Sequence, residues 1–316
     1  VWGIIGSVAS LAGPLLGGFL VASFGWQAAF WVHIPFVIAA IALALLWIPK
    51  LPTTAQDIDM PSAIVSLIAL GSIVFGIQQG PELDWDWRAL VVLAIGIVAS
   101  IAFVRLQTSA QDRGSTPLFP VELFHNRNYA AGSVGILTMG FMAASVMLPV
   151  MLWLQSVKGL SAGEAGIIVA PMALVSMLMS PIAGILTDVV NPRLMGLVGF
   201  NLMIASLCLA WWVMHADANP WWLSLPIAVL GIGQSFIWGS NAATTLRDIS
   251  PHHMGAASGA YNTSRQVGSV VGVALVSAVM QTGNPTTAII NSILVIVIAL
   301  VVGLISSLRY VDTLHG

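Results

Sequence analysis

The stretch that decides the fold runs from Ala9 to Gly18 and reads Ala-Ser-Leu-Ala-Gly-Pro-Leu-Leu-Gly-Gly, inside an unbroken apolar run. In water it would make a poor helix, because proline removes a backbone hydrogen bond and each glycine costs about 1 kcal/mol relative to alanine. In a membrane, small residues at this spacing let a second helix approach closely, and neighbouring helices satisfy the freed backbone groups. We therefore predict a bent transmembrane helix in which Ala9, Gly13, Pro14, Gly17 and Gly18 act through packing and gating.

The composition supports a membrane protein. The chain has 316 residues, of which 58% are hydrophobic and 7% charged, and its mean hydropathy is +0.95. Soluble domains carry about 25% charged residues, so a water-soluble globule is excluded. Without a basic cluster, no nucleic-acid partner is expected. Cys208 is the single cysteine, so we expect no metal site and no bound cofactor. The predicted spans carry no cluster of reactive side chains at membrane depth, so we do not expect an enzyme.

Ten stretches are apolar over the roughly 20 residues that a membrane span needs. They cover residues 2–23, 27–48, 61–80, 88–106, 129–154, 163–187, 194–214, 220–243, 255–281 and 286–308. Short connectors rich in Gly, Pro and Asn separate them. The longest connector, 107–128, is expected to end in a short helix on the membrane surface. The sequence therefore predicts an all-α polytopic membrane protein with about ten transmembrane helices.

Basic residues predict the orientation of these spans. With the connector after the second span in the cytoplasm, only Arg88 and Lys158 fall outside. Seven others fall inside, namely Lys50, Arg105, Arg113, Arg127, Arg193, Arg247 and Arg309. This predicts a multi-pass protein of the plasma (inner) membrane with a cytoplasmic C-terminus. The outer interface would then carry Trp85, Trp87, Trp153, Trp221 and Trp222.

Several motifs resemble those of one transporter family. The element Gly13-Pro14-Leu15-Leu16-Gly17-Gly18, followed by Phe24-Gly25-Trp26, resembles the antiporter motif in the fifth helix of major facilitator exporters. Further matches follow in the family's order: Gly80-Pro81-Glu82-x-x-Trp85, Gly184-x-x-x-Asp188-x-x-Asn191-Pro192-Arg193 and Asn262-Thr263-x-Arg265-Gln266. The whole chain resembles the fourteen-helix drug:proton antiporters of the EmrB/QacA type, from the fifth helix onward and lacking the first four helices.

The resemblance implies a partial major facilitator fold. Residues 1–48 would hold the last two helices of the N-terminal bundle, 49–128 two extra central helices and a cytoplasmic linker, and 129–316 the C-terminal six-helix bundle. It further implies a secondary active transporter for proton-coupled efflux of drugs or amphipathic small molecules, with the bilayer and the missing N-terminal helices as partners. Export of a lipid or metabolite, and a truncated chain without transport activity, remain alternatives.

Charged residues supply the first candidates for function. All 12 acidic residues fall in connectors or at span ends, so the titrating carboxylate is expected in the missing segment. Asp188 ends a span, where the helix dipole disfavours a carboxylate, and we expect Arg193 to pair with it. The resemblance implies that this pair is a cytoplasmic latch; the alternative is an ordinary surface pair worth at most about 1 kcal/mol.

Arg265 lies about three turns into its span, with Asn262 and Gln266 on the same face. An arginine at this depth is expected to face a cavity, a carboxylate or a lipid phosphate. The alternative is that its side chain snorkels to the cytoplasmic interface.

Amide, aromatic and methionine side chains suggest a substrate cavity. Gln234, Trp238 and Asn241 follow one another at i, i+4 and i+7 and form one stripe on a helix, while Asn201 is expected to be buried in the preceding span. Met142 belongs to a methionine-rich span. Such a lining suits amphipathic substrates because soft side chains re-pack around them. Helix packing is the alternative, and for the methionines it is the favoured one.

Overall fold

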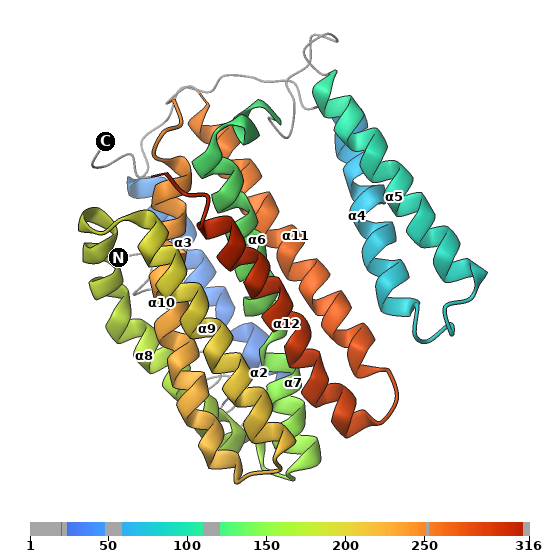
Figure 1. Cartoon of the computed structure of the whole chain (residues 1–316), viewed down its shortest axis with the longest axis vertical. Helices are drawn as coiled ribbons and strands as arrows, with labels where there is room; N and C mark the ends of the chain where they lie inside the picture. The colour runs from blue at the N-terminus through green and yellow to red at the C-terminus, as the bar shows by residue number, and fades with distance from the viewer. Residues whose placement is uncertain (1–19, 21–23, 48–58, 110–120, 251–252, 312–316) are drawn as a thin grey trace.

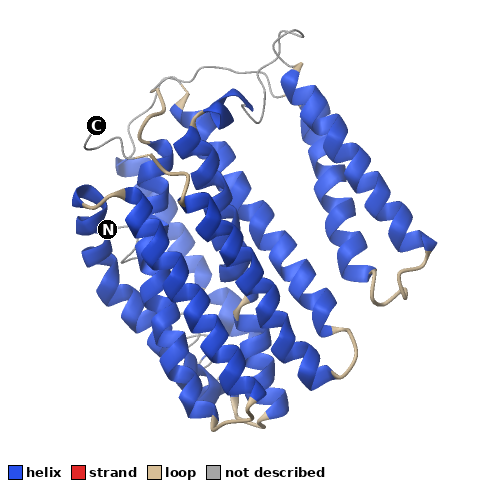
Figure 2. Ribbon diagram, in the orientation of Figure 1, coloured by secondary structure: helices blue, strands red, loops and turns tan. Residues whose placement is uncertain are grey.

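The computed structural model describes residue 20 and residues 24–47, 59–109, 121–250 and 253–311. Within these ranges the regular structure is helical, with no strand (Figure 2), which confirms the predicted all-α class. Among the described residues, eight helices are long and apolar enough to cross a membrane. The motif residues Ala9, Gly13, Pro14, Gly17 and Gly18 lie outside the described residues.

The helices follow the predicted spans closely. In chain order they are α2 (Trp26–Trp31), α3 (His33–Trp47), α4 (Met60–Gln79), α5 (Trp87–Thr108), η1 (Val121–His125), α6 (Arg127–Ser145), α7 (Met147–Leu152), η2 (Trp153–Val157), α8 (Ala162–Val189), α9 (Pro192–His215), η3 (Pro220–Leu223), α10 (Ser224–Leu246), α11 (Met254–Met280) and α12 (Pro285–Ser307). The predicted span 27–48 is divided at Val32, and the 15 residues of α3 fall short of the length that a straight span needs.

Local sequence explains where the helices begin. The Asn191 side chain accepts a hydrogen bond from the first turn of α9, and Pro192 takes the first helical position, where no backbone N–H is needed. Asn284 and Pro285 start α12 in the same way. α8 begins with a reciprocal capping box between Ser161 and Glu164. The Asn-Pro pairs at 191–192 and 284–285, which lie in the predicted connectors, are therefore helix starts.

Helices α6 and α8–α12 form one bundle around a shared core, and Figure 1 shows α4 and α5 as a hairpin beside it. In the bundle α8 packs on α10, α6 on α11, and α9 on both α10 and α12, while the hairpin touches the bundle through α4 and α11. None of the residues of α3 is buried. The bundle therefore provides the packed core of the described chain.

Backbone contact joins α6 to α11. A Cβ added at Gly268 would lie 1.9 Å from the carbonyl oxygen of Leu137, and one at Gly140 would lie 2.1 Å from that of Arg265. A Cβ added at Gly259, about two and a half turns before Gly268 on α11, would meet no atom of the described residues within 4 Å. The two helices therefore cross at Gly268 and Gly140 at a distance that excludes any side chain.

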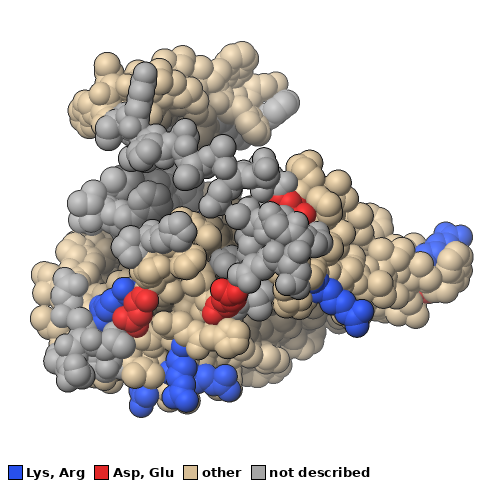
Figure 3. Space-filling model, turned by 90° about the horizontal axis from the view of Figure 1, so that it is seen from above, with Lys and Arg blue, Asp and Glu red and all other residues tan. Residues whose placement is uncertain are grey.

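The two ends of the bundle differ in character. One end, here called the arginine end, carries the termini of α6, α9, α10 and α12 with Arg127, Arg193, Arg247 and Arg309; Figure 3 looks onto it and shows basic side chains gathered there. The opposite, tryptophan end carries the exposed side chains of Trp85, Trp87, Trp221 and Trp222. Basic residues and these tryptophans thus lie at opposite ends, and which end faces the cytoplasm stays a prediction.

Two expectations about the ends need correction. Trp153 is not an interface residue, because its side chain is fully buried in the bundle core. The connector before α6 does end in a short helix, η1, but its Leu123 and Phe124 pack against Tyr129 and Ile249 at the bundle end. The apolar side of η1 therefore packs against protein. In a helix lying on the membrane surface, that side would contact lipid.

Candidate functional site

The stripe predicted on α10 divides into two parts. Gln234 and Trp238 are half-buried, and Trp238 packs against the edge of the bundle core. Within the described residues the Gln234 amide has no hydrogen-bonding partner. An amide at membrane depth without a partner is costly, so this part of α10 offers a polar group for a further contact.

Asn241, one turn further along α10, is buried, with 3% of its surface exposed. Its amide nitrogen donates to the carbonyl oxygen of Gly132, at 2.9 Å, and to the Tyr261 hydroxyl, at 2.8 Å. Its amide oxygen accepts a hydrogen bond from the Tyr310 hydroxyl. Asn241 thus joins α10 to α6, α11 and the segment after α12, and no hydrogen of its amide is left for a ligand.

A second set of bonds continues this network toward the arginine end. Asn128 exchanges hydrogen bonds with the backbone of Val311, at 2.9 and 3.1 Å, and also donates to the Asp248 carboxylate at 3.2 Å. Burial raises the pKa of the Tyr310 phenol, which keeps it protonated as a donor. These contacts hold the segment after α12 against the start of α6 and against α10.

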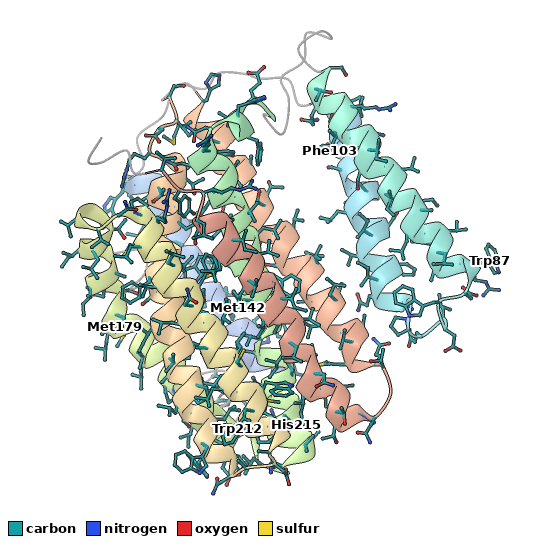
Figure 4. The ribbon with its side chains drawn as sticks, viewed as in Figure 1. Trp87, Phe103, Met142, Met179, Trp212 and His215 are labelled. Carbon is teal, nitrogen blue, oxygen red and sulfur yellow. The ribbon has the colours of Figure 1, made fainter. Side chains whose placement is uncertain are left out.

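Asn201 and Met142, both predicted to line a substrate cavity, lie in different environments from the one predicted. Asn201 is not buried: it is exposed on α9, and its amide donates to the Leu197 carbonyl one turn back, at 2.8 Å. This internal bond removes the need for a buried partner. Met142 lies midway along the bundle (Figure 4) and is fully buried in the core, which agrees with the packing interpretation of the methionines.

The polar residues of α11 do not share one environment. Asn262 and Gln266 are exposed, and the Asn262 amide bonds to the Ser258 carbonyl in its own helix at 3.3 Å. Arg265 is half-buried, and within the described residues its guanidinium has no hydrogen-bonding partner, although it interacts electrostatically with Tyr261. A partner carboxylate was one of the surroundings expected for Arg265, and none of the described carboxylates pairs with it.

Arg193, which the sequence placed in a connector, lies in the first turn of α9, and its partner is a backbone group. Its Nε and Nη2 atoms donate to the carbonyl oxygen of Tyr310, at 3.2 and 2.8 Å. Asp188 is in the last turn of α8, but its side chain lies outside the described residues. The Asp188–Arg193 pair therefore stays a prediction.

The described acidic residues occupy helix ends and connectors. They are Asp59, Glu82, Asp84, Asp86, Glu122, Glu164, Asp188, Asp217 and Asp248. At the tryptophan end Asp217 forms an ion pair with Lys158 at 2.5 Å. Over the described ranges, no three His, Cys, Asp or Glu side chains come together as metal ligands.

Sequence reasoning missed the partners of Asn241. Gly132, Tyr261 and Tyr310 lie on three other segments, and nothing in their local sequence links them. One weak signal was available, since a tyrosine directly after the last span has a hydroxyl that must find a partner when the ring is buried.

Comparison of the sequence with known proteins identifies the family of this chain. A profile described as the Major Facilitator Superfamily matches residues 1–273. A Mycobacterium tuberculosis protein named as an uncharacterised MFS-type transporter is 36% identical over 283 residues, which cover 88% of this chain and 48% of the relative. The multidrug resistance protein Stp of that species is 26% identical over 290 residues, covering 89% of this chain and 51% of the relative.

A third relative has a named export function. The tetracenomycin C resistance and export protein of Streptomyces glaucescens is 27% identical over 286 residues, covering 89% of this chain and 52% of that protein. The chain thus spans about half the length of these relatives. The part of the chain that the structure describes is all-helical, with eight helices long and apolar enough to cross a membrane, as a membrane transporter requires. On the profile match and this architecture together, the chain belongs to the Major Facilitator Superfamily, a family of multi-pass membrane transporters.

Proposed function

We propose that this chain is part of a secondary active transporter that exports drugs or other amphipathic small molecules in exchange for protons. The half-buried face of α10 with Gln234 and Trp238 would contribute to the substrate site. Asn241 would fix the position of this face through its bonds to three other segments. The substrate class is supported by relatives whose names include multidrug resistance and antibiotic export.

The observation that carries the proposal is the Gln234 amide. It is half-buried in an apolar span and has no hydrogen-bonding partner within the described residues, whereas the amides of Asn201 and Asn262 are bonded within their own helices. The Trp238 ring one turn away supplies a flat apolar surface. An aromatic side chain beside one unpaired polar group is the arrangement that small-molecule sites use for orientation and affinity.

The proton pathway is proposed to lie outside this chain. Every acidic residue that the structure describes is at a helix end or in a connector, where a carboxylate cannot carry a proton across the middle of the membrane. The chain spans about half the length of its relatives. We place the coupling carboxylate in the other half, and the arginine end with the C-terminal segment in the cytoplasm.

The test is a substrate profile. The full-length transporter is expressed in cells that lack their own drug exporters, and resistance is measured against a panel of amphipathic compounds. Trp238→Ala is expected to lower resistance to some compounds by about fivefold or more and to leave others unchanged, because a ring that contacts ligand contributes more than about 1 kcal/mol. Gln234→Ala should change the order of preference for compounds with hydrogen-bonding groups.

Trp212 provides the matched control. It lies on α9 with 58% of its surface exposed, so Trp212→Ala removes the same side chain from a site away from the α10 stripe and should preserve the profile. The proposal fails if Trp238→Ala lowers resistance to every compound in proportion to the amount of protein in the membrane. That result would assign Trp238 to packing alone.

A further inference from the structure

A groove at the arginine end is not part of the proposed substrate site. It lies between α6 and α12, beside η1 and the start of α9, and its volume is about 650 Å³. We call it the α6–α12 groove. Its basic members are Arg127, Arg193, Arg309 and His125, and its apolar members include Val134, Val302 and Ile305. None of the described residues that line it is acidic.

The charges in the groove are available to a ligand. Arg193 uses two of its nitrogen atoms on the Tyr310 carbonyl, which fixes its guanidinium at the groove wall. Arg127 and Arg309 form no side-chain hydrogen bond and no ion pair with any described residue. The carboxylate of Asp248 is bound to Asn128 and does not line the groove. Among the described residues, the groove therefore holds positive charge with no carboxylate lining it.

The apolar members of the groove face away from the core. Val302 and Ile305 on α12 are exposed over 47% and 54% of their surfaces, and Val134 on α6 over 37%. They lie on the membrane-spanning parts of the two helices. Basic groups at the end of a span, above an apolar surface open to lipid, match a molecule that has an anionic head and apolar chains.

We propose that the α6–α12 groove is a binding site for an anionic phospholipid of the leaflet that meets the arginine end. Arg127 and Arg309 bind the phosphate and Arg193 lines the wall beside it. Val302 and Ile305 contact the first carbons of an acyl chain. The bound lipid would cover the groove and tie α12 to α6 at the point where the chain leaves the membrane. The proposal does not depend on which compound is transported.

The experiment measures lipid retention by native mass spectrometry on the full chain in detergent, with added phosphatidylglycerol or phosphatidylcholine. The wild type is expected to retain phosphatidylglycerol in preference to phosphatidylcholine. The double variant Arg127→Gln/Arg309→Gln should weaken phosphatidylglycerol binding by about thirty-fold, the effect expected from two basic side chains beside an anionic lipid. Arg88→Gln, which removes an exposed arginine at the tryptophan end, should have no effect.

Two further arms separate the lipid from a free anion. Ile305→Gln should weaken phosphatidylglycerol binding although all basic residues remain, because it places a polar side chain where the acyl chain of the lipid would bind. Inorganic phosphate should displace little lipid. Equal retention of the two lipids, unchanged binding by the double variant, or full displacement by phosphate would each overturn the proposal. Size-exclusion chromatography of each variant shows that the fold is retained.

Discussion

The crossing of α6 and α11 allows a sharp test of the packing argument. In Gly268→Ala the new methyl group would lie 1.9 Å from the Leu137 carbonyl oxygen, where ordinary contact needs about 3.4 Å. The obstructing atom belongs to the backbone and cannot rotate away, so the helices must separate by more than 1 Å. Overpacking costs about 1–3 kcal/mol, and we expect a value near 3 kcal/mol. For a chain of this size the midpoint of thermal unfolding should fall by about 5 °C.

Gly259→Ala is the control, because it makes the same substitution on the same helix with nothing within 4 Å. It should leave the midpoint unchanged or raise it slightly, since alanine favours the helix by about 1 kcal/mol. Gly140→Ala, which would meet the Arg265 carbonyl at 2.1 Å, should repeat the loss. The assay is the fraction of purified protein that stays monodisperse in detergent after heating. Equal midpoints for Gly268→Ala and Gly259→Ala would refute the close crossing.

Two further substitutions test the hydrogen bonds of Asn241 and the predicted latch between Asp188 and Arg193. Asn241→Leu leaves the hydroxyls of Tyr261 and Tyr310 buried without their partner, so unfolding measurements should show a loss of about 2–3 kcal/mol, at about 1 kcal/mol for each bond. In a cycle with Tyr310→Phe the two losses should be non-additive by about 1 kcal/mol, and simple additivity would contradict the shared bond. Asp188→Asn should reduce export per molecule without reducing abundance in the membrane; export at the wild-type rate would argue against a latch with Arg193.

Most of the helical architecture could be predicted from the sequence because each span carries its own signal. A run of about 20 apolar residues specifies a span without reference to any other part of the chain. Helix starts were less clear, since Asn191 and Pro192 were noted only as turn formers. They proved to be the cap and first position of α9. Both signals are local, which explains why they survive in the folded structure.

The surroundings of single polar residues could not be predicted in this way. The spacing of Gln234, Trp238 and Asn241 placed them on one face of α10, but burial along that face depends on which helices pack against it. Asn201 was expected inside because it is polar in a span, yet it satisfies its amide within α9 and remains exposed. The same limit applies to Trp153, whose ring is buried in the core although its indole N–H has no hydrogen-bonding partner among the described residues.

The bonds between Asn128 and Val311 have a consequence for synthesis of the protein. The two residues are 183 positions apart in the chain, and Tyr310 reaches Asn241 only after α12 has been made. At about 5–20 residues per second, the ribosome needs roughly 10–40 s to pass from one end of this contact to the other. During that time the side-chain amide of Asn128 lacks its two hydrogen bonds with Val311. Closure of the bundle at this end is therefore a late event of biogenesis, and one that a nascent chain stalled before residue 310 cannot complete.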